Sequence, residues 1–245
     1  MLETLLNLFE NYKNTCPINK LRTKCVTFAR DVAHLTYLNG KQKDVWVITP
    51  DIRTPSSSSN GIKYYPMEYP EYWFTMYHNH VNKNYSGKIA SIGYNSDIHK
   101  TVLIGVEGLK VVNAPNGFKV QFVHTGKVDI EDSVSIGPYS VIHRGTMSNT
   151  TIRNGCKFGA YTNIGHNCDI GRNTIMAAGV VLNGGVKVGK NCWFASRSTV
   201  RHHVNICDDV VIGLGSVVLK DITEPGIYVG NPARYLKPIT KGWNF

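Results

Sequence analysis

The amino-acid sequence predicts a mainly β fold, a parallel β-helix of hexapeptide repeats that follows a small α/β domain. Two observations predict the solenoid: an apolar residue recurs at every sixth position of one long stretch, and a small residue recurs at a fixed distance behind it. A period of six fits neither the 3.6-residue period of an amphipathic helix nor simple alternation along a strand. The apolar positions, twelve in register, are Ile152, Phe158, Ile164, Ile170, Met176, Leu182, Val188, Phe194, Val200, Ile206, Ile212 and Val218.

The small residues stand four positions after the apolar ones and include Cys156, Thr162, Cys168 and Cys192. One large side chain on each side fills the axis of a narrow prism, and a small one fits near each corner. Three hexads complete one triangular coil, so residues 18 apart are expected to stack on successive coils. The inward cysteines act as compact apolar residues, and we expect them to be reduced.

Composition and charge limit the function classes. Hydrophobic residues make up 42% of the 245-residue chain, and no apolar run reaches 18 residues, so no membrane span is predicted. The opening segment, MLETLLNLFENYK, has leucines on one helical face but carries Glu3 and Glu10, which indicates an amphipathic helix rather than a signal peptide. The 27 Lys and Arg residues outnumber the 17 acidic ones but are scattered, which argues against a nucleic-acid partner.

Cysteine and histidine spacing bears on metals and on location. No CxxC motif or Cys/His cluster has the spacing of a zinc site, so no metal is predicted. Reduced cysteines are typical of the cytoplasm, which is the expected location.

Changes in sequence texture divide the chain into three parts. Residues 1–86 contain a buried-strand pattern, DVWVITP, and an aromatic segment that begins a helix after Pro70, so they predict an α/β domain. Residues 87–222 carry the hexapeptide repeat. Residues 223–245 contain the turn sequences EPG and GNPA and are expected to form a cap and tail.

Two interruptions break the repeat. The first, at 107–126, predicts a hairpin insertion around Asn116 and Gly117. The second, HRGTMSNTT, leaves ten residues between Ile142 and Ile152 instead of the twelve of two hexads. Insertions in a solenoid form loops on one face, often the binding face, so both segments are candidates for a site.

The 18-residue coil also decides which chemically active residues share a corner. Histidine performs acid/base chemistry near neutral pH, and glycine lets a backbone N–H approach a ligand without obstruction. One corner combines these residue types at two adjacent turn positions: His166, Gly184 and His202 at the first, and Asn167, Gly185 and His203 at the second. The spacing therefore predicts a polar groove along this corner.

The segment that contains IGHNCDIG and HHVNICDDVVIG resembles the UDP-3-O-acylglucosamine N-acyltransferases of lipid A synthesis. It is also similar to the wider group of left-handed β-helix sugar N-acetyltransferases. The hairpin ending VHTGKVDIEDSVSIG and the N-terminal VTFARD, VWVITP and PEYWF fit the same family, so the resemblance covers most of the chain. It implies a left-handed solenoid and an N-terminal domain that binds the uridine of a UDP-sugar.

The resemblance implies a role for each matching residue. His166 is the general base that takes a proton from the sugar amine, and the N–H of Gly184 stabilises the oxyanion. Several relatives have an acidic residue beside the base, where this chain has Asn167, so the partner that orients His166 stays open, with Asp169 as the one candidate. The remaining predicted contacts are His203, His202, Asn167, Tyr72 and Phe74 for the substrate, and Gly184, Gly185, Arg234 and Lys237 for the acyl donor.

The ending YVGNPARYL is similar to that of acetyl-CoA-dependent members of the group, and no long helical extension follows it. We therefore expect a homotrimeric N-acetyltransferase that uses acetyl-CoA and acts on a UDP-linked amino sugar, a 4-amino-4,6-dideoxy sugar in particular. Three alternatives stay open: a long-chain acyltransferase that uses acyl carrier protein, a non-catalytic trimeric solenoid that binds a nucleotide sugar, and a γ-class carbonic anhydrase.

Overall fold

The computed structural model describes residues 1–10, 12, 14–16, 25–29, 45–49, 62–83, 87 and 89–240. The chain divides into two compact units. Unit 1 comprises Met1–Ser86 and Leu109–Val123, and unit 2 comprises Gly87–Gly108 and His124–Phe245. The hairpin that interrupts the repeat thus groups with the N-terminal residues. No helix in the described part of the chain combines the length and the apolar character needed to cross a membrane.

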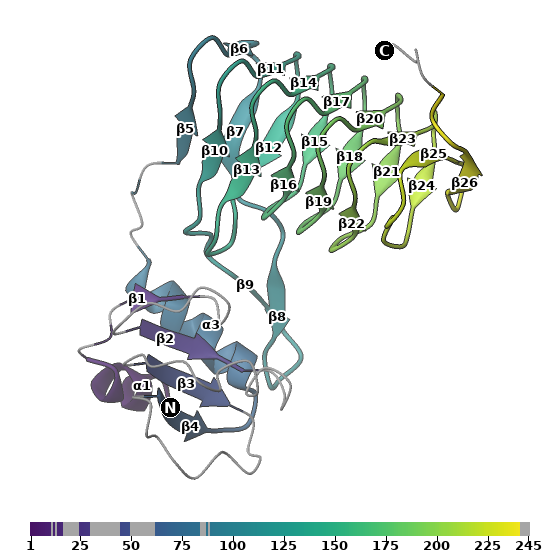
Figure 1. Ribbon diagram of the computed structural model, residues 1–245. Helices are drawn as coiled ribbons and strands as arrows, with labels where there is room; N and C mark the ends of the chain where they lie inside the picture. The colour runs from purple at the N-terminus through teal and green to yellow at the C-terminus, as the bar shows by residue number, and fades with distance from the viewer. Residues whose placement is uncertain are drawn as a thin grey trace. The chain divides into compact units, whose positions relative to one another are not determined.

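Unit 1 is built on a parallel four-stranded sheet with the strand order β1-β2-β3-β4 (Figure 1). Its strands are β1 (Asn14–Thr15), β2 (Cys25–Phe28), β3 (Val45–Thr49) and β4 (Ile62–Pro66). In the described part of unit 1, two helices accompany the sheet, α1 (Leu2–Leu8) and α3 (Pro70–Val81). An antiparallel pair, β8 (Val111–Asn113) and β9 (Lys119–Gln121), forms the hairpin predicted around Asn116 and Gly117.

The core of unit 1 is aromatic because α3 turns its ring-bearing face inward. Phe74, Tyr77 and His78 are buried on this helix, at the spacing of one helical face. The Phe74 ring lies 4.9 Å from the Phe28 ring and 6.3 Å from the Phe122 ring, measured between centroids. These contacts attach α3 to the sheet and to the hairpin.

Unit 2 is a solenoid of three sheets whose coils stack from β5 to the C-terminal strands (Figure 1), and every strand pair in them is parallel except β25 with β26. Sheet 1 contains β5 (Ala90–Ile92), β10 (Val128–Ile130), β13 (Thr150–Ile152), β16 (Asp169–Ile170), β19 (Lys187–Val188) and β22 (Asn205–Ile206). Sheet 2 contains β6 (Asp97–Ile98), β11 (Ser135–Ile136), β14 (Lys157–Phe158), β17 (Ile175–Met176), β20 (Trp193–Phe194), β23 (Val210–Ile212), β25 (Gly226–Val229) and β26 (Arg234–Lys237). Sheet 3 contains β7 (Leu103–Val106), β12 (Val141–His143), β15 (Asn163–Ile164), β18 (Val181–Leu182), β21 (Thr199–Val200) and β24 (Val217–Val218).

The predicted hexapeptide fold is confirmed residue by residue. Ile152 pairs with Ile170, and Ile170 with Val188, so positions 18 apart stack as the repeat requires. All twelve apolar repeat positions are buried along one continuous core.

The small inward positions are filled as predicted, and the cysteines among them are free thiols. Burial raises the pKa of Cys156 to about 11 and the pKa of Cys168 to about 12. Burial also raises the pKa of Cys192 to about 12. These thiols therefore stay protonated and act as packing groups. In unit 1, by contrast, Cys16 is disulfide-bonded.

Both interruptions of the repeat fall at the same corner, where the chain passes from sheet 3 to sheet 1. The hairpin leaves after β7 and returns before β10. The second break lies between β12 and β13, and there Ile130 pairs with Ile152, 22 positions on rather than 18. The break is therefore an insertion of four residues into one hexad, because 22 exceeds 18 by four, and not a shortening of two hexads as the sequence suggested.

Candidate functional site

His166 stands at the corner between β15 and β16, on the turn that joins sheet 3 to sheet 1. Gly184 occupies the same turn position one coil later, and the turns are joined by backbone hydrogen bonds. The N–H of Gly185 donates to the carbonyl of His166 at 2.7 Å, and the N–H of His203 donates to the carbonyl of Gly184 at 3.0 Å. The 18-residue spacing thus brings His166, Gly184 and His203 to one corner.

Two glycines make room for the histidine rings between these coils. A Cβ atom on Gly184 would lie 2.6 Å from Nε2 of His166, and a Cβ on Gly185 would lie 2.4 Å from Nδ1 of His203. Real Cβ atoms do not approach so closely, so any side chain on Gly184 would displace the His166 ring. The N–H of Gly184 donates no hydrogen bond to any residue in the described part of the chain, which leaves it available to a ligand.

Asn167 is the partner that orients His166. Its Oδ1 atom accepts a hydrogen bond from Nδ1 of His166 at 2.8 Å. The same oxygen also accepts hydrogen bonds from the backbone N–H of Thr146 at 3.1 Å and from its hydroxyl at 3.0 Å. On the other side of the amide, Nδ2 of Asn167 donates to the carbonyl oxygen of Ser148 at 2.8 Å. A carbonyl can only accept, so this contact decides which end of the amide faces the histidine.

The amide orientation in turn decides the protonation of the histidine. Since Oδ1 of Asn167 can only accept, Nδ1 of His166 carries the hydrogen, and a neutral ring then has its free lone pair on Nε2. Nε2 is the nitrogen that faces Gly184. The corner therefore presents a proton acceptor beside an unused backbone donor, which are the two groups that an acyl transfer requires.

The four-residue insertion supplies this orientation. Thr146 and Ser148 both lie within it, and they bind the two ends of the Asn167 amide. Asp169, the candidate partner named from the sequence, does not orient His166: its carboxylate accepts hydrogen bonds from Nε of Arg153 at 3.1 Å and from the Nη2 atom at 3.0 Å. This pairing holds the pKa of the Arg153 guanidinium above its ordinary value.

A second histidine adjoins the first and was not found by the sequence analysis. His124 is completely buried, and its ring lies 5.7 Å from the His166 ring, edge against face. Nδ1 of His124 lies 3.9 Å from a carboxylate oxygen of Glu107. A Cβ on Gly108 would meet Cδ2 of His166 at 2.8 Å and Nε2 of His124 at 3.3 Å. These three residues, Glu107, Gly108 and His124, stand where the hairpin leaves and re-enters the solenoid. The break in the hexapeptide repeat at 107–126 is therefore the sequence signal that points to them.

The predicted aromatic contacts lie in unit 1. Phe74 is completely buried, with its ring against Phe28 and Phe122. It is therefore a core residue and, contrary to the prediction from the sequence, does not offer a ring face to a nucleobase. Tyr72 is half-buried and lies edge-on against Trp73, 4.8 Å between centroids.

The other predicted contacts of unit 2 are spread over the solenoid. His202 is exposed, and its ring lies 5.5 Å from that of His203. Arg234 and Lys237 are exposed on β26, which extends sheet 2, whereas the His166 corner joins sheets 3 and 1. Within one chain the structure therefore does not bring these two cations to the histidine corner. Among the described residues, no three His, Cys, Asp or Glu side chains are grouped so that they could hold a metal ion.

Comparisons with known proteins agree with the fold of unit 2. Residues 149–184 match the family model described as bacterial transferase hexapeptide, six repeats. The UDP-3-O-acylglucosamine N-acyltransferase of Herminiimonas arsenicoxydans is 39% identical over 140 residues, which cover 57% of this chain and 40% of the relative. The protein of the same name from Janthinobacterium sp. (strain Marseille) is 39% identical over 139 residues, covering 57% of this chain and 39% of the relative. The chain thus spans about two fifths of the length of these curated relatives.

Among solved structures, the UDP-N-acetylglucosamine O-acyltransferase of Moraxella catarrhalis aligns with a TM-score of 0.55 and 25% identity. The alignment covers 61% of this chain and 56% of that one.

These relatives overturn one prediction from the sequence. The expectation of an acetyl-CoA-dependent enzyme for a 4-amino-4,6-dideoxy sugar was wrong, because the curated relatives are named for N-acyl transfer to UDP-3-O-acylglucosamine. They favour the alternative of a UDP-glucosamine N-acyltransferase. The prediction of the fold and of the resemblance is confirmed. The solenoid of this chain is a left-handed β-helix of hexapeptide repeats, and part of it resembles the bacterial transferase hexapeptide family.

Proposed function

We propose that this protein is an N-acyltransferase that moves an acyl group from a thioester to the amino group of a UDP-3-O-acylglucosamine-type sugar. The observation that carries the proposal is the His166–Asn167 pair, which leaves a lone pair on Nε2 beside Gly184. The names of the relatives support the acceptor. The donor is a long-chain acyl group on acyl carrier protein, and the active form is a homotrimer.

The reaction needs no covalent enzyme intermediate, because a thioester is already activated. The sugar nitrogen attacks the thioester carbonyl carbon while Nε2 of His166 takes a proton from that nitrogen. The negative charge that develops on the carbonyl oxygen accepts a hydrogen bond from the N–H of Gly184. The tetrahedral intermediate then collapses, the C–S bond breaks, and the leaving thiolate takes the proton from the His166 imidazolium. The products are an amide and a free thiol, and the enzyme returns to its starting state.

Other residues take supporting roles in this proposal. His203 lies one coil beyond Gly185 and contacts the substrate or the donor from the far side of Gly184. Unit 1 binds the uridine, with Tyr72 as the remaining aromatic contact, since Phe74 is buried. Arg234 and Lys237 are distant from the histidine corner of their own chain, so their proposed contact with the phosphate of the donor's pantetheine arm would be made at a neighbouring subunit of the trimer.

The test is acyl transfer by the purified full chain, followed by mass spectrometry of the nucleotide sugar. UDP-3-O-acylglucosamine is the acceptor, and the donors are a long-chain acyl carrier protein, the matching acyl-CoA and acetyl-CoA. We expect an amide product with the acyl carrier protein donor and at least about tenfold slower transfer from either CoA thioester. Transfer to a hydroxyl of UDP-N-acetylglucosamine, or no transfer from any donor, would contradict the proposal.

A first prediction concerns Asn167. Asn167→Ala removes the acceptor at Nδ1 of His166, so the ring is free to rotate or change tautomer, and we expect kcat to fall about 10²-fold. Asn167→Asp restores an acceptor and adds a negative charge, which raises the pKa of a neighbouring histidine. The acid limb of its pH–rate profile should therefore move to higher pH.

Asn173→Ala is the matched control for the backbone, because both asparagines adopt left-handed turn conformations, with φ of 63° at Asn167 and 56° at Asn173. It should unfold at a temperature similar to that of Asn167→Ala and keep full activity. Equal kcat losses in the two variants would assign the effect to turn strain instead of to the histidine.

A further inference from the structure

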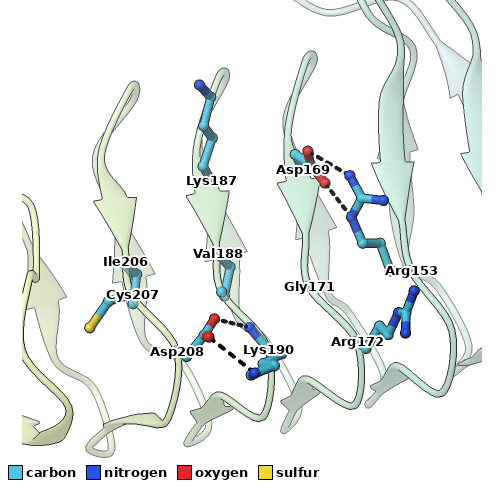
Figure 2. A pocket seen from close by; sticks show the side chains of 11 residues that line it. Arg153, Asp169, Gly171, Arg172, Lys187, Val188, Lys190, Ile206, Cys207 and Asp208 are labelled. Atoms are coloured by element: carbon cyan, nitrogen blue, oxygen red, sulfur yellow. Dashed lines mark hydrogen bonds and ion pairs between the residues drawn. The ribbon is translucent and has the colours of Figure 1, made fainter.

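The outer face of sheet 1 carries an open groove that no step of the proposed mechanism uses (Figure 2). The groove has a volume of about 550 Å³ and spans the coils that contain β16, β19 and β22. Its charged lining consists of Arg153, Asp169, Arg172, Lys187, Lys190 and Asp208. These are four basic and two acidic side chains, so the lining has two positive charges in excess.

The two acidic side chains are already neutralised. Asp169 forms the two-pronged contact with Arg153. Asp208 lies 3.5 Å from Nζ of Lys190 and also accepts a hydrogen bond from the backbone N–H of that lysine. Within the described residues, neither Arg172 nor Lys187 forms an ion pair. The excess charge of the groove therefore resides on these two side chains.

Lys187 lies at the end of the groove nearest the catalytic corner. It stands three residues after Gly184 on the same coil, within about 10 Å along an extended chain. Figure 2 shows its side chain running toward the turn that precedes β19, away from Lys190. The paired positions on the neighbouring coils hold Asp169, which binds Arg153, and Asn205, which binds Asp221. Of these three stacked positions, the one at Lys187 holds a basic side chain, and it lies beside the His166 corner.

We propose that Lys187 binds the diphosphate of the nucleotide sugar and that Arg172, at the other end of the groove, adds to the positive potential there. This inference rests on the proposed function. In a UDP-linked 2-amino sugar, only C2, C1 and the glycosidic oxygen separate the amine from the nearest phosphorus. An amine held at Nε2 of His166 therefore places the diphosphate beside the same corner. Lys187, three residues after Gly184 on the same coil, is within reach of it. A lysine ammonium binds phosphate oxygens as a compact point charge.

The experiment is calorimetric binding of UDP, UMP and uridine to the full chain. Because hydrogen bonds to charged groups are strong, we expect Lys187→Ala and Lys187→Gln to weaken UDP binding by about 10- to 100-fold. Both variants should bind uridine as the wild type does, because uridine has no phosphate. Lys190→Ala is the matched control, since its cation belongs to the same groove but is paired with Asp208. It should change UDP affinity by less than about threefold.

Equal UDP affinity in the wild type and in both Lys187 variants would overturn the inference, as would a wild type that binds UDP no better than uridine. The binding readout needs no turnover, so it separates this inference from the proposed function. If the chain binds UDP through Lys187 but transfers no acyl group, the proposed reaction is refuted and the phosphate-binding role of Lys187 is supported. If Lys187→Ala transfers the acyl group with an unchanged KM for the nucleotide sugar, the phosphate-binding role of Lys187 is refuted and the proposed reaction is supported.

Discussion

We expect His166→Asn to lower kcat for acyl transfer by about 10²- to 10⁴-fold, the usual contribution of a general base. The substitution removes Nε2, the ring nitrogen nearest to Gly184, and leaves the turn and its backbone hydrogen bonds in place. The binding of UDP and the midpoint of thermal unfolding should therefore stay close to the wild-type values. The measurement is a steady-state rate with saturating donor and acceptor, together with a melting curve of each protein.

The control is His99→Asn, at an exposed histidine on another corner that contacts Thr101. It should retain full activity. A loss under about threefold in His166→Asn would mean that the amine arrives already neutral, with no need for a base in the rate-limiting step. The oxyanion contact of Gly184 would then remain as the main catalytic element.

The fold could be predicted from sequence because each hexad repeats the same packing problem. A large residue such as Ile164 or Leu182 fills one side of the prism, and the next coil presents the same requirement 18 positions later. With twelve such positions, chance agreement is negligible. The same regularity brings His166, Gly184 and His203 to one corner, so their proximity follows from sequence spacing alone.

The rest of the site could not be predicted because it lies where that regularity is broken. Thr146 and His124 stand in or beside insertions, so counting by 18 from His166 does not reach them. Their positions follow from where the chain leaves the regular coil and returns to it, which depends on tertiary contacts and not on period. The partner of His166 was left open in the sequence for this reason, although Asn167 adjoins it directly.

Two other predictions depended on sequence features that fit more than one role. The aromatic segment of α3 fits either a core or a binding surface, because both use flat apolar rings, and the burial of Phe74 decides for the core. The choice of donor depended on the GNPA turn. That turn precedes β26, which pairs with β25 at the end of sheet 2, so it closes the solenoid and carries no information about the thioester.

Gly184→Ala should lower kcat by about 10²-fold while the protein remains folded, because a displacement of about 1 Å in a catalytic group costs that much. The new Cβ would lie 2.6 Å from Nε2 of His166, so the ring must move away from the amine. The backbone itself tolerates alanine: Ala160 and Ala178 occupy the equivalent first turn position at the corner between sheets 2 and 3. The variant also keeps the N–H that binds the oxyanion.

A double-mutant cycle tells a displaced base from a damaged fold. If alanine acts by moving His166, then adding Gly184→Ala to His166→Asn should cost less than about threefold more, because the base is already absent. If the two losses multiply instead, the alanine acts on the thioester carbonyl or on the turn, and the contact between Gly184 and Nε2 is not what limits the rate. Melting curves of the single variants exclude unfolding as the cause, since both should match the wild type. The cycle thus tests whether glycine is required at this corner to leave space for the base.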